Sequence, residues 1–456
     1  MKDLEKIHIL GICGTFMGGV AVLARSMGCI VSGSDKNVYP PMSTQLEKIG
    51  IKMHQGYDDS VLATEFNAVI VGNVMTRGME VVESLLASKQ NYISGPQWLG
   101  ENLLRQKKVF AVAGTHGKTT TSSMLAWILQ DNHHYPGFLI GGVAQNFAIS
   151  ARTTANECFV IEADEYDSAF FDKRSKFVHY HANIAVLNNL EFDHADIFKD
   201  LDAIKTQFHH FVRTIPKTGT LIVNDEDNNL KDVLKMGCWT PVVRFGLSDK
   251  ADIWAKPLTA DCATFEIYQQ QKKKAKISWH LTGSHNMLNA LAAMTAALQQ
   301  GVSLPQAAQS LQKFKGIKRR MEFIGEVNGV KIYDDFAHHP TAIATTLKGM
   351  KNKINQQKLI AVFEPRSNSM RSGAHGLQLP TAFTAADCAV VMNDTTLSWD
   401  AAVIENLQEL NIATPSDLQE LFALLKKEAQ ADCTVVFMSN GSFANAPRLF
   451  LQALQC

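Results

Sequence analysis

The sequence AVAGTHGKTTTSSMLAWIL, at residues 111–129, runs from an apolar, strand-like segment through two glycines into a segment with helical spacing. This order is typical of a phosphate-binding loop, in which backbone amides and a lysine surround phosphate oxygens. The usual pattern has a further glycine five positions before Gly117, but Val112 occupies that position. The surrounding sequence favours a nucleotide site with a variant loop over an ordinary glycine-containing helix start.

Two side chains at the start of the predicted helix have the chemistry that a nucleotide site needs. Lys118 can neutralise the β- and γ-phosphates, and the hydroxyl of Thr119 can ligate Mg²⁺. Gly114 and Gly117 allow backbone amides to turn toward phosphate oxygens. We therefore predict that this loop binds a nucleoside triphosphate.

Acidic residues follow two further apolar runs, FVIEADEYD at 159–167 and LNNLEFDH at 187–194. In a parallel sheet the carboxyl ends of neighbouring strands open on one edge, and Mg²⁺ prefers carboxylate and phosphate oxygens. Any one of these acids alone is an ordinary solvated loop residue. Their coincidence with the loop lysine and threonine singles out Glu162 and His194. The other acids of the two runs are Asp164, Glu165, Asp167, Glu191 and Asp193.

The chain alternates strand-like and helix-like segments in three blocks, which predicts an α/β protein with parallel sheets and helices on their faces. The predicted domain boundaries are 1–106, 107–318 and 319–456. A lysine-containing section at 263–283 is read as a hairpin with the lysines at its solvated tip. The segment DLQELFALLKKEAQ is amphipathic, with Leu418, Leu421, Phe422 and Leu425 on one face. The strand-like runs of the third block are 358–366, 387–394 and 433–441.

Composition limits the classes of function. The 456 residues suggest about three domains at roughly 150 residues each. Lys plus Arg and Asp plus Glu are both 44, which gives no support to nucleic-acid or acidic-membrane binding. The eight cysteines contain no CxxC pair, so we expect reduced thiols in a cytoplasmic protein. No signal-peptide core is apparent, and no apolar run reaches the ~18 residues of a membrane span.

A second glycine cluster, GICGTFMGG, lies near the N-terminus. The dinucleotide fingerprint needs a glycine where Cys13 stands, so that match fails. Gly11 and Gly14 still form a strand-to-helix turn that can hold an anionic phosphate, and Asp35 ends the next strand, where a ribose hydroxyl is often held. Nucleotide or diphosphate binding is favoured here over a ligand-free turn, and a nicotinamide cofactor is disfavoured.

Together these motifs resemble the Mur ligases, the ATP-dependent amide-forming enzymes of peptidoglycan assembly, over essentially the whole chain. GTHGKTTT resembles their ATP loop, which lacks the early glycine, so Val112 is no objection. EADE and FDH resemble their magnesium-binding segments, and GSHNMLNALAA, KRRMEF and YDDFAHHPTAI resemble their adenine, hinge and closing segments. The resemblance implies a Rossmann-like N-terminal domain, a central P-loop ATPase-like domain with a parallel sheet, and a Rossmann-like C-terminal domain.

The resemblance also implies roles for individual residues. ATP contacts are implied for Gly114, Thr115, Gly117, Lys118, Thr119, Thr120, Asn286, Asn289, Arg320 and Asp335, with His338 as a further candidate. Magnesium ligation is implied for Thr119, Glu162 and His194, and a catalytic role for Lys118, Glu162 and His194. The turn with Gly11, Gly14 and Asp35 is implied to bind the UDP part of a substrate. The domains would then bind, in order, the UDP-sugar, ATP and a peptide.

Two phrases narrow the choice within the family. EADEYDSAFFDKRSKFVHY and FEPRSNSMRSGAH resemble the peptide-recycling branch, whereas the alanine-adding branch tends to read EADESDASFL and QPHRFTRT. The resemblance implies that ATP activates UDP-N-acetylmuramate as an acyl phosphate, which then takes the tripeptide L-alanyl-γ-D-glutamyl-meso-diaminopimelate. The alternative is a UDP-N-acetylmuramate–L-alanine ligase. Arg366 and Asn368 are candidate peptide-binding residues, and a structural salt bridge is the competing interpretation of Arg366.

Three other classes of function are weaker. A plain P-loop nucleoside triphosphatase would hydrolyse its nucleotide without a sugar substrate. A nicotinamide dehydrogenase would rest on the first block alone, where the fingerprint is broken. A non-catalytic nucleotide-sugar binding protein would not need Lys118, Glu162 and His194 together. The sequence does not identify the group that removes the proton of the attacking amine.

Overall fold

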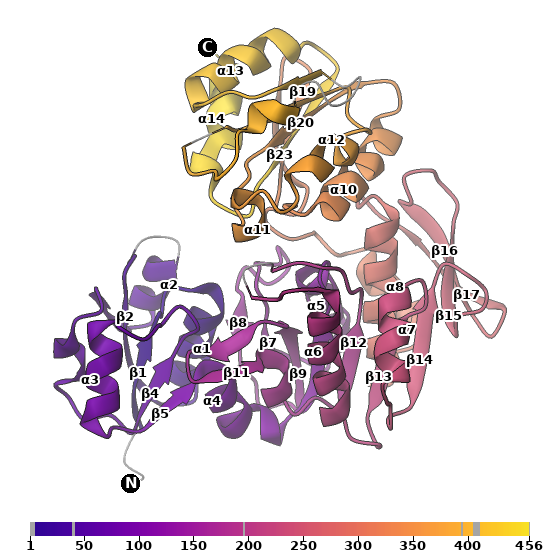
Figure 1. Cartoon of the computed structure of the whole chain (residues 1–456). Coiled ribbons are helices and arrows are strands. Elements are labelled where there is room, and N and C mark those ends of the chain that lie inside the picture. The colour runs from indigo at the N-terminus through magenta and orange to yellow at the C-terminus, as the bar shows by residue number, and fades with distance from the viewer. Residues whose placement is uncertain (1–4, 39–41, 195–196, 394, 405–410, 456) are drawn as a thin grey trace. The chain divides into compact units, whose positions relative to one another are not determined.

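The computed structural model describes residues 5–38, 42–194, 197–393, 395–404 and 411–455 (Figure 1). Contacts divide the chain into two compact units. The first comprises Met1–Leu190, Asp202–Phe245 and Ala292–Ser310, and the second comprises Glu191–Leu201, Gly246–Leu291 and Leu311–Cys456. The predicted boundaries after residues 106 and 318 stay predictions.

The first sheet of the first unit is wholly parallel, with the strand order β3-β2-β1-β4-β5. Its strands are β1 (Lys6–Leu10), β2 (Ile30–Asp35), β3 (Lys52–Gln55), β4 (Ala68–Val71) and β5 (Tyr92–Ser94). Its helices are α1 (Thr15–Ser26), α2 (Met42–Lys48), α3 (Glu80–Ser88) and α4 (Gly95–Asn102). The apolar strands β1, β2 and β4 and the helices α1 and α3 were predicted, whereas β3 and β5 carry too few apolar residues to stand out.

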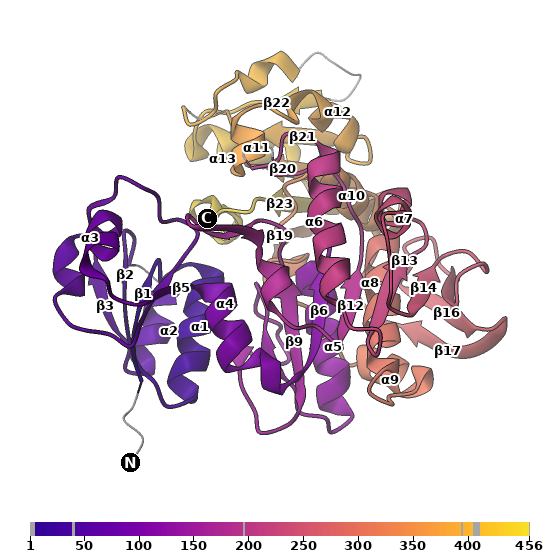
Figure 2. The same ribbon diagram turned by 60° about the horizontal axis from the view of Figure 1, so that its bottom comes forward.

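The second sheet of this unit holds the phosphate-loop motif. Within this unit its strands run in the order β14-β13-β12-β6-β9-β7-β8, and all neighbours except β7 and β8 pair in parallel. Figure 2 shows β6 between β9 and β12. The strands are β6 (Lys108–Ala113), β7 (Gly137–Leu139), β8 (Ala151–Arg152), β9 (Cys158–Ala163), β12 (Ile184–Leu187), β13 (Thr220–Asn224) and β14 (Val242–Gly246). The neighbouring helices are α5 (Lys118–Asp131), α6 (Leu201–Thr214) and α7 (Asn228–Lys235).

The second unit contains an antiparallel group of three strands and a six-stranded sheet. The group comprises β15 (Ile253–Pro257), β16 (Thr264–Gln269) and β17 (Lys272–Ser278). The six strands are β18 (Glu322–Val327), β19 (Val330–Asp335), β23 (Cys433–Met438), β20 (Lys358–Phe363), β21 (Cys388–Val391) and β22 (Asn411–Ala413), in that spatial order. Only β18 pairs antiparallel in this sheet.

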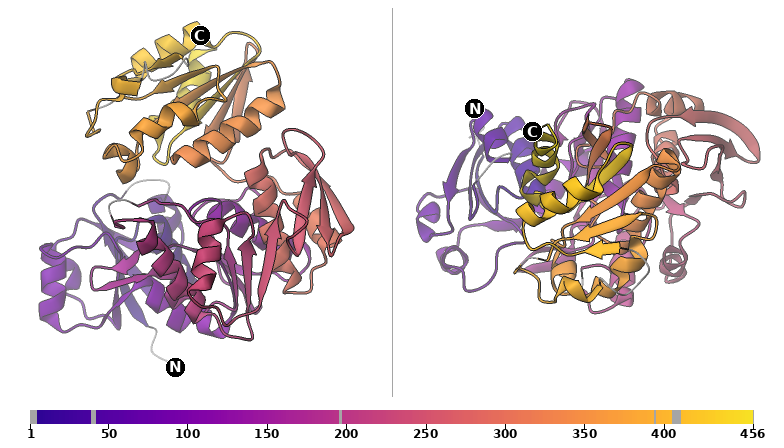
Figure 3. Two further views of the ribbon diagram at one scale, coloured as in Figure 1. Left: turned by 45° about the vertical axis from the view of Figure 1, so that its right-hand side comes forward. Right: turned by 90° about the horizontal axis from the view of Figure 1, so that it is seen from above.

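Helices cover both faces of the six-stranded sheet (Figure 3). The helices are α10 (Pro340–Ile354), α11 (Asn368–Arg371), α12 (Leu379–Ala382), α13 (Leu418–Glu428) and α14 (Ala446–Ala453). Helices α10 and α12 pack on Phe363 and its neighbours, and α13 and α14 pack on the opposite face. The predicted apolar face of α13 is confirmed, since Leu421 and Leu425 are buried and Leu418 and Phe422 pack against the same core. Two helices, α8 (Ser284–Leu298) and α9 (Leu304–Leu311), precede this sheet in the chain.

One local prediction needs correction. The lysines at 272–274 do not form the hairpin tip, because they begin strand β17. Gln270 and Gln271 make the turn, and both have left-handed backbone conformations. The lysines are exposed, as expected, because one edge of this strand faces solvent.

Two expectations from composition concern the cysteines, expected as reduced thiols, and membrane-spanning helices, of which none was expected. The seven cysteines in the described ranges are free thiols. Cys456, and Asp394 at the end of one predicted strand run, lie outside the described residues. Within those residues, no helix has both the length and the apolar character to cross a membrane.

The hairpin that follows β9 in the chain packs into the core of the first sheet. Strands β10 (Asp167–Ala169) and β11 (Asp172–Ser175) form this hairpin. Ala169 is buried with Leu10, Val71 and Leu85, and Phe170 packs against the same cluster. The hairpin continues into a short 3₁₀ helix at Lys176–His179, here called η3. The hairpin therefore completes the hydrophobic core of the first sheet.

Helix α4 contacts η3 at a glycine. A side-chain carbon on Gly100 would overlap the backbone carbonyl oxygen of His179, and backbone cannot move aside as a flexible side chain can. Gly100→Ala should lower the free energy of unfolding by about 1–3 kcal/mol, although alanine favours helix. Urea unfolding of the purified protein measures the change. Glu101→Ala, on the exposed side of the same helix, is the control, and equal stability of the two variants would disprove this contact.

Candidate active site

The loop between β6 and α5 has the geometry of a phosphate cradle. Gly117 caps the helix with φ 77°, a left-handed conformation that only glycine adopts readily. Gly114 passes close to the neighbouring strand end, where a side-chain carbon would lie 3.0 Å from Cβ of Asn188. Helix α5 then begins at Lys118, so its first backbone amides are available to an anion.

Two asparagines directly after the adjacent strand β12 hold this loop. The backbone amide of His116 donates to Oδ1 of Asn189 at 2.7 Å, and Nδ2 of Asn189 donates to the carbonyl of His116 at 3.0 Å. Asn188 also donates to the carbonyl of His116, at 3.1 Å. Sequence reasoning missed these two residues, although the pair Asn-Asn directly after a buried apolar run was a usable signal.

The structure brings Thr119 and Glu162 together, as the sequence predicted. The Thr119 hydroxyl donates to the Glu162 carboxylate, with oxygen distances of 2.9 and 3.1 Å. Glu162 is the last residue but one of strand β9, and it accepts a further bond from the backbone amide of Gly141 at 2.7 Å. Burial and the nearby Asp164 raise the pKa of Glu162, while Lys118 opposes them. A hydroxyl beside a carboxylate is a suitable donor set for Mg²⁺, so these residues fit that ion.

Lys118 lies in a group of buried carboxylates. Its Nζ is 3.2 Å from Oε2 of Glu165 and 3.7 Å from Oδ1 of Asp164, and it donates to the Gly114 carbonyl at 2.8 Å. Burial alone lowers the pKa of this ammonium, but the carboxylates, Glu165 foremost, raise it above its ordinary value. The neighbouring carboxylates therefore favour the charged form of Lys118 at the start of α5, where its ammonium can interact with a phosphate.

A second buried lysine stands beside the same acids. Nζ of Lys176 is 3.6 Å from Oδ2 of Asp164, and the Lys176 side chain is 4% exposed. Sequence reasoning missed it, because the run FFDKRSKF reads as an ordinary charged surface hairpin. Only the fold reveals that this lysine points inward.

The glycine turn after β1 is organised around Asp35. The carboxylate of Asp35 accepts from the backbone amide of Cys13 at 2.9 Å, and from that of Asn37 at 3.1 Å. Cys13 does not have a positive φ, so its backbone conformation here does not require glycine. Gly14 precedes helix α1 as its N-cap, so the first amides of α1 are available at this turn. Gly11, Gly14 and Asp35 thus lie at one turn, and their binding of the UDP part stays a prediction.

The remaining predicted residues lie in the second unit. His194 follows Asp193, whose carboxylate accepts from the His194 backbone amide at 2.7 Å. Burial raises the pKa of Asp193, but the charge of His194 and this hydrogen bond lower it to about 2. Glu162 and His194 belong to different units, so their joint ligation of magnesium stays a prediction.

Asp335, the last residue of β19, contacts the segment that carries Arg320 and precedes β18. The carboxylate of buried Asp335 accepts from the backbone amides of Met321 at 2.7 Å and Ala337 at 2.8 Å. Burial raises the pKa of Asp335, and the charge of Arg320 opposes this. The Arg320 guanidinium lies over the Phe336 ring, 4.7 Å from its centroid. Asp335 therefore fixes the segment that carries Arg320.

The predicted adenine-contacting residues lie at the start of α8. Asn286 donates from Nδ2 to the Thr282 carbonyl at 2.8 Å, and Asn289 is buried one turn further on. Burial and, secondarily, the charge of Arg320 lower the pKa of His285 to about 4, so this histidine is neutral near pH 7. A neutral, partly apolar helix start is suited to a nucleobase.

Arg366 and Asn368 lie just beyond the end of β20, and both are exposed. In the ranges that the structure describes, no carboxylate pairs with the Arg366 guanidinium. Among these residues the competing interpretation of Arg366 as a structural salt bridge has no support, and its role in peptide binding stays a prediction. Ser367 between them caps helix α11 by accepting from the Met370 amide at 3.3 Å.

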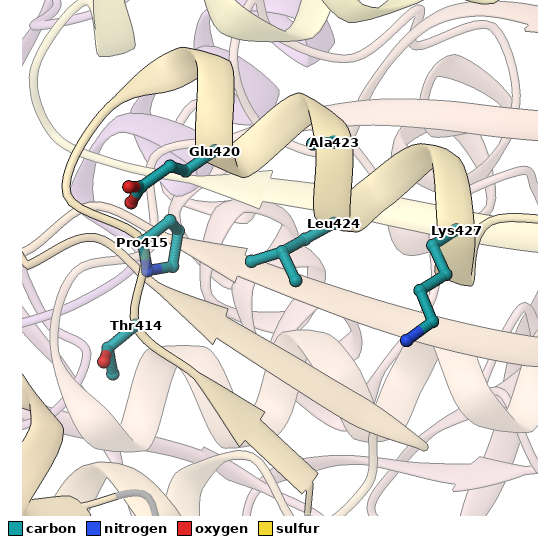
Figure 4. A pocket seen from close by; sticks show the side chains of 6 residues that line it. All are labelled: Thr414, Pro415, Glu420, Ala423, Leu424 and Lys427. Atoms are coloured by element: carbon teal, nitrogen blue, oxygen red, sulfur yellow. The ribbon is translucent and has the colours of Figure 1, made fainter.

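A separate surface pocket involves none of the predicted residues (Figure 4). It has a volume of about 470 Å³ and lies along α13. Its lining residues are Thr414, Pro415, Glu420, Ala423, Leu424 and Lys427. The predicted site residues are therefore not in this pocket.

Comparison with known families decides the relationship. Three family models match in order: the Mur ligase family catalytic domain at residues 6–107, the Mur ligase middle domain at 112–297, and the Mur ligase glutamate ligase domain at 319–441. The chain belongs to the Mur ligase family. Its three-domain α/β architecture is that of this family, and the loop with Val112 in place of glycine lies within the matched range.

Individual relatives are similar over nearly the whole chain. The UDP-N-acetylmuramate–L-alanyl-γ-D-glutamyl-meso-2,6-diaminoheptandioate ligases of Escherichia coli K12 and Haemophilus influenzae are 48% and 46% identical, and the alignments cover 98% and 99% of this chain and 98% and 100% of theirs. A murein peptide ligase crystal structure from Psychrobacter arcticus matches with a TM-score of 0.78 and 46% identity, covering 99% and 98% of the two chains. Relatives called UDP-N-acetylmuramate–L-alanine ligase are 29–34% identical.

The asparagine clamp on the phosphate loop can be tested directly. Asn189→Ala removes both hydrogen bonds that the Asn189 side chain makes to His116 and leaves the one from Asn188, so the loop is held less firmly. At about 1 kcal/mol net for each bond, ATP affinity should fall about tenfold or more, as measured by titration with a fluorescent ATP analogue. Asn183→Ala is the control, because Asn183 accepts from the Val109 amide at the other end of β6. Equal affinities of the two variants would refute the clamp.

Proposed function

We propose that this protein joins UDP-N-acetylmuramate to the tripeptide L-alanyl-γ-D-glutamyl-meso-diaminopimelate in an ATP- and Mg²⁺-dependent reaction of peptidoglycan recycling. The full-length identity of 46–48% to ligases of that name is the observation that supports this substrate pair most strongly. The contact of Lys118, Thr119 and Glu162 at one loop supports ATP as the energy source. We assign the reaction to the cytoplasm, where ATP and nucleotide sugars are supplied.

The chemistry follows from the poor reactivity of a carboxylate, whose leaving group would be oxide. An oxygen of the lactyl carboxylate attacks the γ-phosphorus of ATP, the bond from phosphorus to the β-γ bridging oxygen breaks, and ADP leaves. The neutral amine of the tripeptide then attacks the acyl carbon and phosphate leaves. Lys118 and the first amides of α5 compensate charge on the transferring phosphoryl group.

Thr119 and Glu162 would hold Mg²⁺, which supplies further positive charge to the phosphate oxygens when bound. The other assignments stay proposals. His194 would complete the magnesium site, and Asn286, Asn289, Arg320 and Asp335 would contact ATP. Gly11, Gly14 and Asp35 would hold the UDP part. No residue is assigned to removal of the amine proton.

The alternative, addition of L-alanine to the same sugar nucleotide, has weaker support. Relatives with that activity in their names share 29–34% identity, against 46–48% for the tripeptide ligases. The two activities share the ATP and sugar sites and differ in the amine substrate. The distinction therefore lies with the peptide-binding residues of the third domain.

The release of ADP distinguishes the tripeptide ligase from the L-alanine ligase and from a plain nucleoside triphosphatase. With ATP, Mg²⁺ and UDP-N-acetylmuramate present, tripeptide should accelerate ADP release far more than L-alanine, measured with a coupled ADP assay. Lys118→Ala should abolish this release, because charge on the phosphoryl group loses its cation. Lys199→Ala, at an exposed lysine, is the control. Release that needs no sugar nucleotide would indicate a plain nucleoside triphosphatase, and greater stimulation by L-alanine would favour the alternative.

Arg366 should act on the peptide and not on the nucleotide. Its exposed guanidinium can pair bidentately with a peptide carboxylate, which contributes a few kcal/mol at most. Arg366→Ala should raise the KM for tripeptide by about 10- to 100-fold and leave the KM for ATP within about twofold. Arg448→Ala, at another exposed arginine of the same domain, is the matched control. Equal increases in both KM values would rule out this role.

A further inference from the structure

Lys176 is a buried cation with no evident structural purpose. The ammonium lies 4.1 Å from the centroid of the Tyr166 ring and 4.5 Å from that of the Phe16 ring. Asp164, at 3.6 Å, is its carboxylate partner, and it is shared with Lys118. Burial lowers the pKa of Lys176, and the attraction of Asp164 only partly opposes this. An apolar side chain would fill the same space without the cost of removing a charge from water.

The position of Lys176 connects the two predicted phosphate sites of the first unit. Phe16 is the second residue of α1, immediately after the turn that contains Gly11 and Gly14. Asp164 touches both Lys176 and Lys118, the first residue of α5. A line of contacts therefore runs from the start of α1 through Lys176 and Asp164 to the start of α5.

The backbone around Lys176 is fixed on both sides. Its amide donates to the Tyr166 carbonyl at 3.1 Å, and the preceding hairpin inserts Ala169 into the core of the first sheet. The following η3 packs against Gly100 of α4. The backbone that carries Lys176 is therefore held in place, and burial of the side chain between Asp164 and the two rings preorganises its ammonium.

The substrates of the proposed reaction have to meet in this region. If the diphosphate of the sugar nucleotide lies at the start of α1, and the γ-phosphate of ATP at Lys118, the lactyl carboxylate must reach from one to the other. A carboxylate and a triphosphate repel each other, so a fixed cation between them lowers the energy of their approach. Lys176 is the buried cation on that line besides Lys118, among the residues that the structure describes.

We propose that the Lys176 ammonium binds the lactyl carboxylate of UDP-N-acetylmuramate and directs one of its oxygens at the γ-phosphorus of ATP. The inference rests on the proposed function and adds a residue to it. Lys176 transfers no proton, because the carboxylate attacks as the anion and ADP leaves with the electrons of the broken bond. The ammonium stays with the acyl phosphate until the amine attacks.

Two sugar nucleotides separate this role from a structural one. UDP-N-acetylglucosamine has the same nucleotide and a closely related sugar but lacks the lactyl carboxylate. Wild-type protein should bind UDP-N-acetylmuramate more tightly than UDP-N-acetylglucosamine in calorimetric titration. In Lys176→Met, the affinity for UDP-N-acetylmuramate should fall at least tenfold, while that for UDP-N-acetylglucosamine should change less than twofold. Equal losses for both ligands, or no loss for either, would overturn the proposal.

Kinetics provide the second measurement. In Lys176→Met, kcat/KM for UDP-N-acetylmuramate should fall by about 100-fold, as when one stabilising donor is removed, and the dissociation constant of ATP should stay within about twofold. Lys176→Arg should recover part of the loss, because it keeps the charge. Lys173→Met, at the exposed lysine of the same hairpin, is the matched control and should behave as wild type.

Failure of the proposed function and failure of the role of Lys176 give different results. If wild-type protein shows no ADP release that depends on UDP-N-acetylmuramate, the proposed function fails and this inference fails with it. If the wild type shows that dependence and Lys176→Met retains it with unchanged kcat/KM, only the role of Lys176 is refuted. Should Lys176→Met fold poorly by thermal unfolding, Lys176→Arg and Lys176→Gln decide, and equal activity of these two would exclude a role for the charge.

Discussion

The buried attraction between Lys118 and the carboxylates at the end of β9 is the interaction on which the first unit depends. Charges are costly to remove from water unless they are paired, and here one ammonium is surrounded by several carboxylates. The group lies at the carboxyl edge of a parallel sheet, where apolar strands end and polar side chains converge. Net negative charge in this group suits a divalent cation, and under the proposed function Mg²⁺ and the phosphates of ATP would complete the charge balance at the same lysine.

Much of this arrangement was predictable, because it follows from periodicity and from side-chain chemistry at fixed spacing. An apolar run, two glycines, Lys118 and Thr119 specify a strand, a turn and a helix start, and the structure has all three. Glu162 follows from the rule that neighbouring parallel strands end on one edge. The environment of Arg366, which has no carboxylate partner among the described residues, did not follow, since a sequence does not say whether a carboxylate lies nearby.

Other features could not be predicted, for specific physical reasons. Asn188 and Asn189 look like loop residues, and their role appears only when β12 lies beside β6. Lys176 belongs to a charged segment that is typical of an exposed hairpin, but in the structure this hairpin packs against the hydrophobic core of the first sheet. The lysines that begin β17 were predicted at the tip of the hairpin. Their charge indicates that they are exposed to solvent, but it does not indicate whether their backbone forms a turn or a strand. In each case tertiary contacts, which a single sequence does not contain, decide the outcome.

The hairpin of β10 and β11 limits how the chain can be divided. Domain boundaries drawn from sequence fall near residue 107, between the first two matched family models. Yet the core of the first sheet is completed by Ala169 and Phe170, which lie some sixty residues further along the chain. A fragment cut at residue 107 would expose the cavity that these residues fill, and a chimera that exchanges the first domain would need to exchange this hairpin as well. Modularity in this protein is therefore a property of contacts and not of consecutive sequence.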